Sequence, residues 1–196
     1  MLNSKKNLVV AAAAGMLAAC SISSAPDKPL EVMTQKDFAS GGKIEMQLSG
    51  GNYEIRPATG DQIRVSFKGN YEGATSDVAI NGTQATVSVK NTPNRNFNAI
   101  VEVPKTSDVK LHLAAGNLEM AAFTGNKDID SGAGNMEIAV GNAQDYASVD
   151  ASNKAGNIDA GPFGKSESGV MKHITWSGPG KYTLRVDLGA GNLELK

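Results

Sequence analysis

The chain has 196 residues, 40% of them hydrophobic, and a formal net charge of −1 at pH 7. This length predicts one domain, and this composition supplies enough apolar side chains to bury a core. A nearly neutral chain lacks the basic surplus that is typical of nucleic-acid-binding proteins, and a single cysteine excludes an intramolecular disulfide. The 22 glycines and the low aromatic content of 5% indicate many turns between small side chains.

The first 19 residues have the pattern of a secretory signal peptide. Two lysines precede an apolar run over residues 8–19, which is too short to span a bilayer comfortably. The run ends in Leu-Ala-Ala followed by Cys20, which resembles the bacterial lipobox of a leucine, two small residues and a cysteine. The resemblance implies cleavage before Cys20 and attachment of lipid to its sulfur and its new amino group. An ordinary signal peptide with an incidental cysteine is the alternative interpretation.

Residues 20–37 are predicted to form a lipidated tether between the membrane and a single domain over residues 38–196. The segment that follows Cys20 is small, polar and proline-containing, as linkers are. In bacterial lipoproteins an aspartate directly after the lipidated cysteine is the usual signal for retention in the inner membrane, and this chain has Ser21 there. The resemblance therefore implies the outer membrane, in a cell that has one, with the domain either periplasmic or surface-exposed.

From Lys43 onward the chain alternates apolar and polar residues with the period of a half-buried β-strand. Two such runs, residues 78–80 and 85–89, flank Asn81-Gly82, a dipeptide typical of the type I′ turn of a β-hairpin. We therefore predict antiparallel hairpins over about 38–104. No helical period with a capping residue follows residue 20.

The second half of the chain, about 105–196, repeats the motif Ala-Gly-Asn followed by an apolar, an acidic and an apolar residue. The copies lie at 115–120, 133–138, 155–160 and 190–195, and a weaker copy lies at 50–55. Glycine and asparagine suit a tight corner, and the alternating triplet suits a strand. A repeat near 20 residues predicts stacked coils about 4.8 Å apart. The predicted fold class is all-β, a short β-solenoid of strand-turn coils with an N-terminal antiparallel hairpin portion.

Stacking in register would align equivalent side chains of successive coils into rows. We expect a ladder of amides, able to donate and accept hydrogen bonds along the row, formed by Asn52, Asn117, Asn135, Asn157 and Asn192. We also expect a row of carboxylates on an outer face, formed by Glu119, Glu137, Asp159 and Glu194, with Glu54 as a further candidate. Adjacent like charges are unfavourable, so Lys110, Lys127 and Arg185 on preceding strands, or bound cations, are expected to compensate them. The row is interpreted either as a solvated polar face or as a weak strip for divalent ions or cationic ligands.

The layout of residues 42–196 resembles bacterial putative-adhesin domains of the β-solenoid type, a family of undetermined function. The matching features are the 49–55 segment, the Val101–Pro104 strand, the four Gly-Asn copies and the Gly178–Tyr182 segment. The resemblance implies the fold, whereas the adhesin label is itself an analogy. The only tryptophan, Trp176, lies near the end of the repeats, and we expect it to cover the open end of the core.

The sequence contains no recognisable catalytic constellation. Its only histidines are His112 and His173, and neither a nucleophile elbow nor a zinc-protease motif occurs. We therefore expect no enzyme, no cofactor and no metal centre. The expected function is that of a non-enzymatic cell-envelope lipoprotein, a structural or adhesin-like module that is held to the membrane through Cys20 and contacts an envelope protein or glycan but no nucleic acid. The alternative is a carbohydrate- or peptidoglycan-binding periplasmic module.

Overall fold

The computed structural model describes residues 27–196. The predicted signal peptide and Cys20 lie outside these described residues, so both remain predictions. Within residues 27–196 no helix has the length and apolar character needed to cross a membrane.

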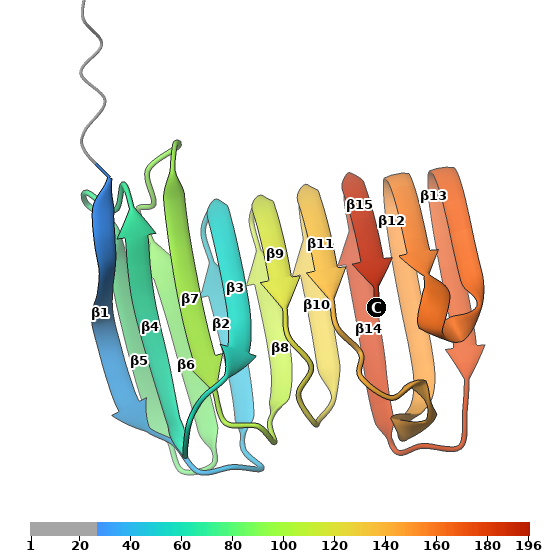
Figure 1. Ribbon diagram of the computed structural model, residues 1–196, viewed down its shortest axis with the longest axis horizontal. Helices are drawn as coiled ribbons and strands as arrows, with labels where there is room; N and C mark the ends of the chain where they lie inside the picture. Colours follow the sequence, from blue (N-terminus) through green and yellow to red (C-terminus); the bar gives the residue numbers. More distant parts are fainter. Residues whose placement is uncertain (1–26) are drawn as a thin grey trace, which may run out of the picture.

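The described chain is all-β, as predicted, and its strands lie in two facing layers (Figure 1). In chain order the elements are β1 (Lys28–Asp37), β2 (Lys43–Leu48), β3 (Gly51–Pro57), β4 (Gln62–Gly69), β5 (Thr75–Asn81), β6 (Gln84–Lys90), β7 (Phe97–Val103), β8 (Asp108–Leu113), β9 (Gly116–Met120), β10 (Lys127–Ser131), β11 (Gly134–Ile138), the 3-10 helix η1 (Ala143–Asp145), β12 (Tyr146–Ala160), the 3-10 helix η2 (Gly161–Phe163), β13 (Lys165–Ser177), β14 (Tyr182–Leu188) and β15 (Gly191–Leu195).

Hydrogen bonds join the strands into one 15-stranded sheet that nearly closes on itself. The order is β1-β4-β7-β3-β9-β11-β15-β12-β14-β10-β8-β2-β6-β5, with β13 paired to β12. The path runs along the front layer from β1, turns through the long strand β12 and returns along the back layer to β5 (Figure 1). β1 and β5 meet at one end of the molecule, where Thr34 Oγ1 lies 2.7 Å from Ser76 Oγ.

Most of the sheet consists of equivalent strand pairs stacked in parallel. In β2/β3, β8/β9, β10/β11 and β14/β15, the first strand lies in the back layer and the second in the front layer, with a short corner between them (Figure 1). Neighbouring pairs are parallel and in register in both layers. Each pair therefore places its alternating apolar side chains between the layers and its polar side chains outside.

The corner glycines are required by the stacking itself. Gly134 has a φ of 137°, and a Cβ added to it would overlap the carbonyl oxygen of Gly116 in the next corner. Gly116 stands in the same relation to Gly51, with a φ of 128°. Such backbone angles favour glycine, and here the neighbouring backbone also occupies the space of a side chain.

The N-terminal portion is only partly antiparallel, so the prediction for residues 38–104 is correct in part. β5 and β6 form the predicted hairpin around Asn81-Gly82, and β4 pairs antiparallel with both β1 and β7. β2 and β3, however, pair parallel with β6 and β7 on one side and with β8 and β9 on the other. The weaker Gly-Asn copy makes the same corner as the later copies, which extends the parallel stack back to residue 43.

Residues 28–37, which the sequence analysis assigns to the tether, form β1. This strand pairs antiparallel with β4 from Lys28 to Asp37, although nearly all its side chains are exposed. Backbone hydrogen bonds hold β1 at this edge of the sheet. Its side chains therefore need not alternate between apolar and polar, and the sequence does not mark it as a strand. Within the described residues the sheet therefore includes residues 28–37.

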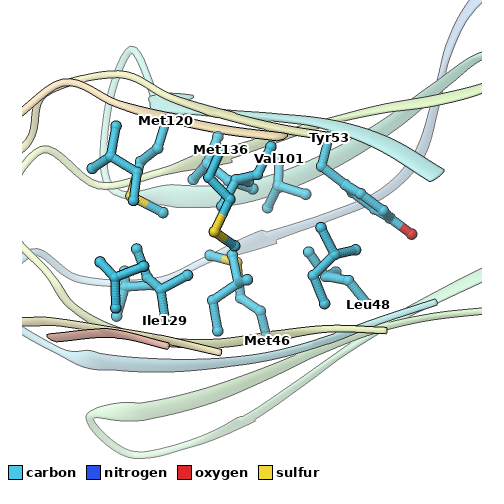
Figure 2. Packing of buried hydrophobic residues seen from close by; sticks show 14 of the residues in the cluster. Met46, Leu48, Tyr53, Val101, Met120, Ile129 and Met136 are labelled. Carbon is cyan, nitrogen blue, oxygen red and sulfur yellow. The ribbon is translucent and has the colours of Figure 1, made fainter. Parts of the chain in front are cut away.

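The core lies between the layers. Figure 2 shows Met120, Met136 and Val101 pointing from the front layer toward Met46 and Ile129 of the back layer, and all five are buried. Aromatic side chains gather at the two ends of the stack. Phe67 and Phe97 pack edge-on at 5.0 Å between ring centroids at the β1 end, and Trp176 packs at 5.0 Å from Phe163 at the β13 end, where the sequence predicted a covering tryptophan.

Candidate functional site

A row of six asparagines runs across the outer face of the front layer. The register of β7, β3, β9, β11, β15 and β12 aligns them, and every Nδ2 except that of Asn98 donates to the Oδ1 of the next residue at 2.9–3.2 Å. In spatial order the row is Asn98, Asn52, Asn117, Asn135, Asn192 and Asn157. All five hydrogen bonds point toward Asn98, so the amide dipoles are aligned along the row.

Asn98 is the member of the row that sequence reasoning missed. It begins no Gly-Asn motif, because Phe97 precedes it and Ala99-Ile100 follow it. The parallel pairing of β7 with β3 places Asn98 beside Asn52, where its Oδ1 accepts a hydrogen bond of 3.2 Å. The alternation of apolar residues after Phe97 was the one sequence signal that could have placed Asn98 in a strand.

A row of carboxylates lies two residues farther along the same strands. The pairings of β3, β9, β11, β15 and β12 place one acidic residue of each strand beside the next. In spatial order they are Glu54, Glu119, Glu137, Glu194 and Asp159. The amide row and the carboxylate row together are called the front face below.

Two cations partly balance the carboxylate row, and they are not the expected ones. Arg56 Nη1 lies 3.2 Å from Glu54 Oε1, and Lys196 Nζ contacts Glu137 Oε1. The pKa of Lys196 is raised by its hydrogen bond with Glu137, and the negative charges of Glu194 and Glu119 add to this effect. Among residues 27–196 no lysine or arginine lies within 4.0 Å of Glu119 or Glu194.

The expected compensation by Lys110, Lys127 and Arg185 is wrong. All three belong to strands of the back layer, β8, β10 and β14. The strand that precedes a corner lies in the opposite layer from the strand that follows it, so its outward side chains face the other side of the molecule. The carboxylate row therefore keeps an excess of negative charge.

The outer face of the back layer differs from the front face because its charges alternate in sign. One register position there holds Glu45, Lys110, Asp128, Arg185 and Asp150 on successive strands. Each charge therefore has opposite charges as neighbours, which stabilises a sheet surface. The field of Asp128 and Asp150 contributes to raising the pKa of Arg185, after the larger effect of its hydrogen bond with Asp187.

The two histidines lie on this back face and do not form a catalytic pair with each other. His112 Nδ1 lies 3.4 Å from Asp130 Oδ1, and His173 Nε2 lies 2.9 Å from Asp150 Oδ1. Both imidazoles are exposed. In the part of the chain that the structure describes, no group of three or more His, Cys, Asp or Glu residues is arranged to hold a metal ion. The carboxylates of the front face form a line, one per strand, and do not converge on a point.

Lys127, which was expected to compensate the carboxylate row, is instead a buried cation on the same face of β10 as Ile129. Its side chain is only 1% exposed, and Nζ donates to Phe123 O at 2.8 Å, to Gly125 O at 3.3 Å and to the Tyr146 hydroxyl at 3.0 Å. Burial lowers the pKa of Lys127 to about 8 and raises the pKa of Tyr146 to about 12. With all three donors satisfied, the ammonium group ties the loop before β10 to the start of β12.

An open groove of about 970 Å³ follows the front face. Its floor consists of residues from both rows, including Asn117, Glu119, Asn135 and Glu137. Lys68, at its β4 end, also lines it. A surface of this kind can hydrogen-bond a polar or cationic chain that lies along the stack.

Comparison with known proteins finds similarity to bacterial structures at low sequence identity. No protein-family model matches the chain, and no curated protein sequence matches it. The chain is similar to the structure of a putative cell adhesion protein from Clostridium sporogenes, with 15% identity, a TM-score of 0.49, and coverage of 86% of this chain and 100% of that chain. It is similar to a putative adhesin from Bacteroides fragilis, with 13% identity, a TM-score of 0.34, and coverage of 87% and 99%.

A putative adhesin from Parabacteroides merdae is also similar, with 13% identity, a TM-score of 0.31, and coverage of 56% of each chain. All three TM-scores are below 0.5. These similarities therefore assign no function to the chain.

Proposed function

We propose that this protein is a non-enzymatic, adhesin-like interaction module of the bacterial cell envelope, anchored by lipid on Cys20. The observation that carries the proposal is the front face, where two straight rows of polar groups cross up to six adjacent strands. In this proposal the stacked strand pairs are a short β-solenoid, whose repeated coils present the same side chains at each step. The outer membrane is the proposed location, in a cell that has one.

The front face suits an extended ligand with repeating polar groups. Each asparagine inside the row donates one N–H to its neighbour, so the second N–H of its amide remains for a ligand. The oxygen of Asn117 already accepts from both Nδ2 and the backbone N–H of Asn135, so the ligand-binding capacity of the row lies mainly in its donors. Glu119 and Glu194, which have no basic partner within 4.0 Å among the described residues, can accept hydrogen bonds from hydroxyl or ammonium groups. Strands about 4.8 Å apart repeat these groups along the whole groove.

A carbohydrate- or peptidoglycan-binding module is the second candidate, and the groove of about 970 Å³ favours it. Amide and carboxylate groups bind the hydroxyls and acetamido groups of such polymers by hydrogen bonds. The one aromatic residue that lines the groove, Tyr53, is buried in the core, so recognition would depend on polar contacts and not on stacking (Figure 2).

The binding proposal is tested with the full mature chain carrying Cys20→Ser, applied to a glycan array and to purified peptidoglycan. The double variant Glu119→Gln/Glu194→Gln changes the front face, and Glu45→Gln/Asp128→Asn is the matched control on the back face. Binding that falls at least fivefold in the front variant alone supports the proposal. Equal binding by the starting chain and both variants, or no binding to any polymer, contradicts a glycan-binding front face.

Labelling of cells with radioactive palmitate, with Cys20→Ser as the control, tests the anchor separately.

A further inference from the structure

The Gly-Asn corners form one continuous edge of the molecule, called the corner edge here. It contains the corners and loops 49–51, 70–74, 91–96, 114–116, 132–134, 154–156, 169–171 and 189–191. Register shows that β1 begins at this edge, because Lys28 is paired with Gly69 and Gly69 with Phe97. The last strand turns at the same edge, because Gly169 of β13 is paired with Gly156 of β12. Figure 1 shows both at the upper side of the view, at opposite ends of the stack.

The far end of the corner edge carries an exposed apolar pair. Val170 is 73% exposed and Met171 is 79% exposed, the highest values among the large hydrophobic side chains of residues 27–196. Met171 has a φ of 52°, a left-handed conformation that is unfavourable for a residue with a side chain. The fold thus holds two apolar side chains in water at a strained turn, where the core offers them no contact.

The near end of the corner edge is where the chain leaves toward the predicted lipid. Cys20 lies eight residues before Lys28, so the residue that carries the anchor is at most about 29 Å from the start of β1. Eight strand spacings separate β1 from β13 along the front layer, or about 38 Å. An anchor at one end and an apolar pair at the other would hold the edge along a flat surface at two points.

The charge of the corner edge favours an anionic surface. Its basic residues, with those at the adjoining strand ends, are Lys28, Lys90, Arg95, Lys154 and Lys172. Its acidic residues are Asp27 and Glu72, and Glu167 Oε2 lies 3.6 Å from Lys172 Nζ. The basic residues still outnumber these acidic ones. Between the charged ends lie small residues, among them Ala115 and Ala190, which let the edge approach a flat partner closely.

We propose that the corner edge docks on the surface of the anionic lipid bilayer that holds the anchor, with Val170 and Met171 inserted among the headgroups. This inference depends on the proposed lipid anchor for its orientation. Two apolar side chains alone bind a membrane weakly, but the anchor makes their contact intramolecular and raises their effective concentration. Docking at this edge would lay the stack along the membrane and stand its strands upright, with the front face perpendicular to the membrane and open to a ligand.

The test uses a fluorescent probe and an anchor that does not require lipidation. The mature chain has one cysteine, so Cys20→Ser combined with Met171→Cys creates a single labelling site for a polarity-sensitive dye. An N-terminal hexahistidine tag then holds the chain on vesicles containing a nickel-chelating lipid, with phosphatidylcholine alone or with phosphatidylglycerol. The matched control is Gln144→Cys, an exposed position in the 3-10 helix η1.

We expect a blue shift and at least threefold protection from an aqueous quencher for the Met171→Cys dye on anionic vesicles, and neither for the Gln144→Cys dye. Replacing Arg95 and Lys154 by glutamate should reduce the protection at least twofold. Equal quenching at both positions overturns the proposal. Protection that appears without vesicles and rises with protein concentration also overturns it, because a second copy would then cover the edge. Since the tag replaces the lipid, a failure of Cys20 lipidation in cells does not affect this result.

Discussion

Asn192 donates a hydrogen bond from Nδ2 to Oδ1 of Asn135 over 2.9 Å, although 57 residues separate them in the chain. The next copy of the motif after Asn135 belongs to β12, yet β15 occupies the place beside β11. The antiparallel pairing of β12 with β13 accounts for this order. It places β13 at the end of the stack and leaves the other edge of β12 for the C-terminal strands.

Removal of an amide from the middle of the row should cost stability. Asn135→Ala removes hydrogen bonds to Asn117 and from Asn192, and we expect the free energy of unfolding to fall by about 1 kcal/mol, since the row is exposed. Asn157 is at the end of the row and donates one such bond, so Asn157→Ala should cost about half as much. Urea denaturation measures both. A loss in Asn157→Ala as large as in Asn135→Ala would contradict the row as the cause.

Replacing glycine by alanine should lower the free energy of unfolding far more at a stacked corner than at an open turn. Gly134→Ala would place a Cβ against the carbonyl oxygen of Gly116 at a φ of 137°, so we expect a loss of about 4 kcal/mol or more. Gly164 has a φ of 66° with no neighbouring atom within 4 Å of an added Cβ. Gly164→Ala should therefore cost only about 1 kcal/mol. Thermal unfolding of the two variants tests the comparison, and similar losses would speak against close corner stacking.

The buried ammonium group of Lys127 predicts a pH dependence of stability. Its pKa is lowered from 10.5 to about 8 in the folded chain, so the unfolded chain binds more protons between these values and stability rises with pH there. Between pH 8 and pH 10 the contribution of Lys127 should increase the free energy of unfolding by about 2 kcal/mol.

Tyrosines also titrate near the top of this range, so the measurement compares two proteins. Lys127→Met should lack the rise, and the difference between it and the starting chain isolates the lysine. A parallel pH dependence of both proteins would show that Lys127 titrates normally when folded.

Charge removal should have opposite effects on the two outer faces. Glu119 lies between the like charges of Glu54 and Glu137, so Glu119→Gln should raise the melting temperature at low salt, and the gain should shrink as salt screens the charges. Asp128 lies between Lys110 and Arg185, so Asp128→Asn should lower the melting temperature. A fall in both variants would contradict the difference between the faces.

The same row predicts how the chain responds to calcium. Because the carboxylates lie in a line and do not converge, millimolar Ca²⁺ should change the melting temperature no more than a sodium salt of equal ionic strength does. A larger stabilisation that Glu119→Gln abolishes would instead identify the row as a cation strip.

The local character of the chain was determined by its sequence. Alternating residues marked the strands, Asn81-Gly82 marked the hairpin, and the repeated Gly-Asn corners marked the strand pairs that stack. These features depend on neighbours in the chain, on φ angles and on which face of a strand is apolar. They can therefore be predicted from the sequence before the strand partners are known.

The tertiary structure alone decided which strands become neighbours. It inserted β15 between β11 and β12, recruited β1 and Asn98, buried Lys127 and set the compensating cations of the front face as Arg56 and Lys196. A strand pairs with whichever edge the rest of the chain leaves open, and backbone hydrogen bonds are alike at every edge. That choice depends on how the whole stack closes around its core, which no local pattern of residues records.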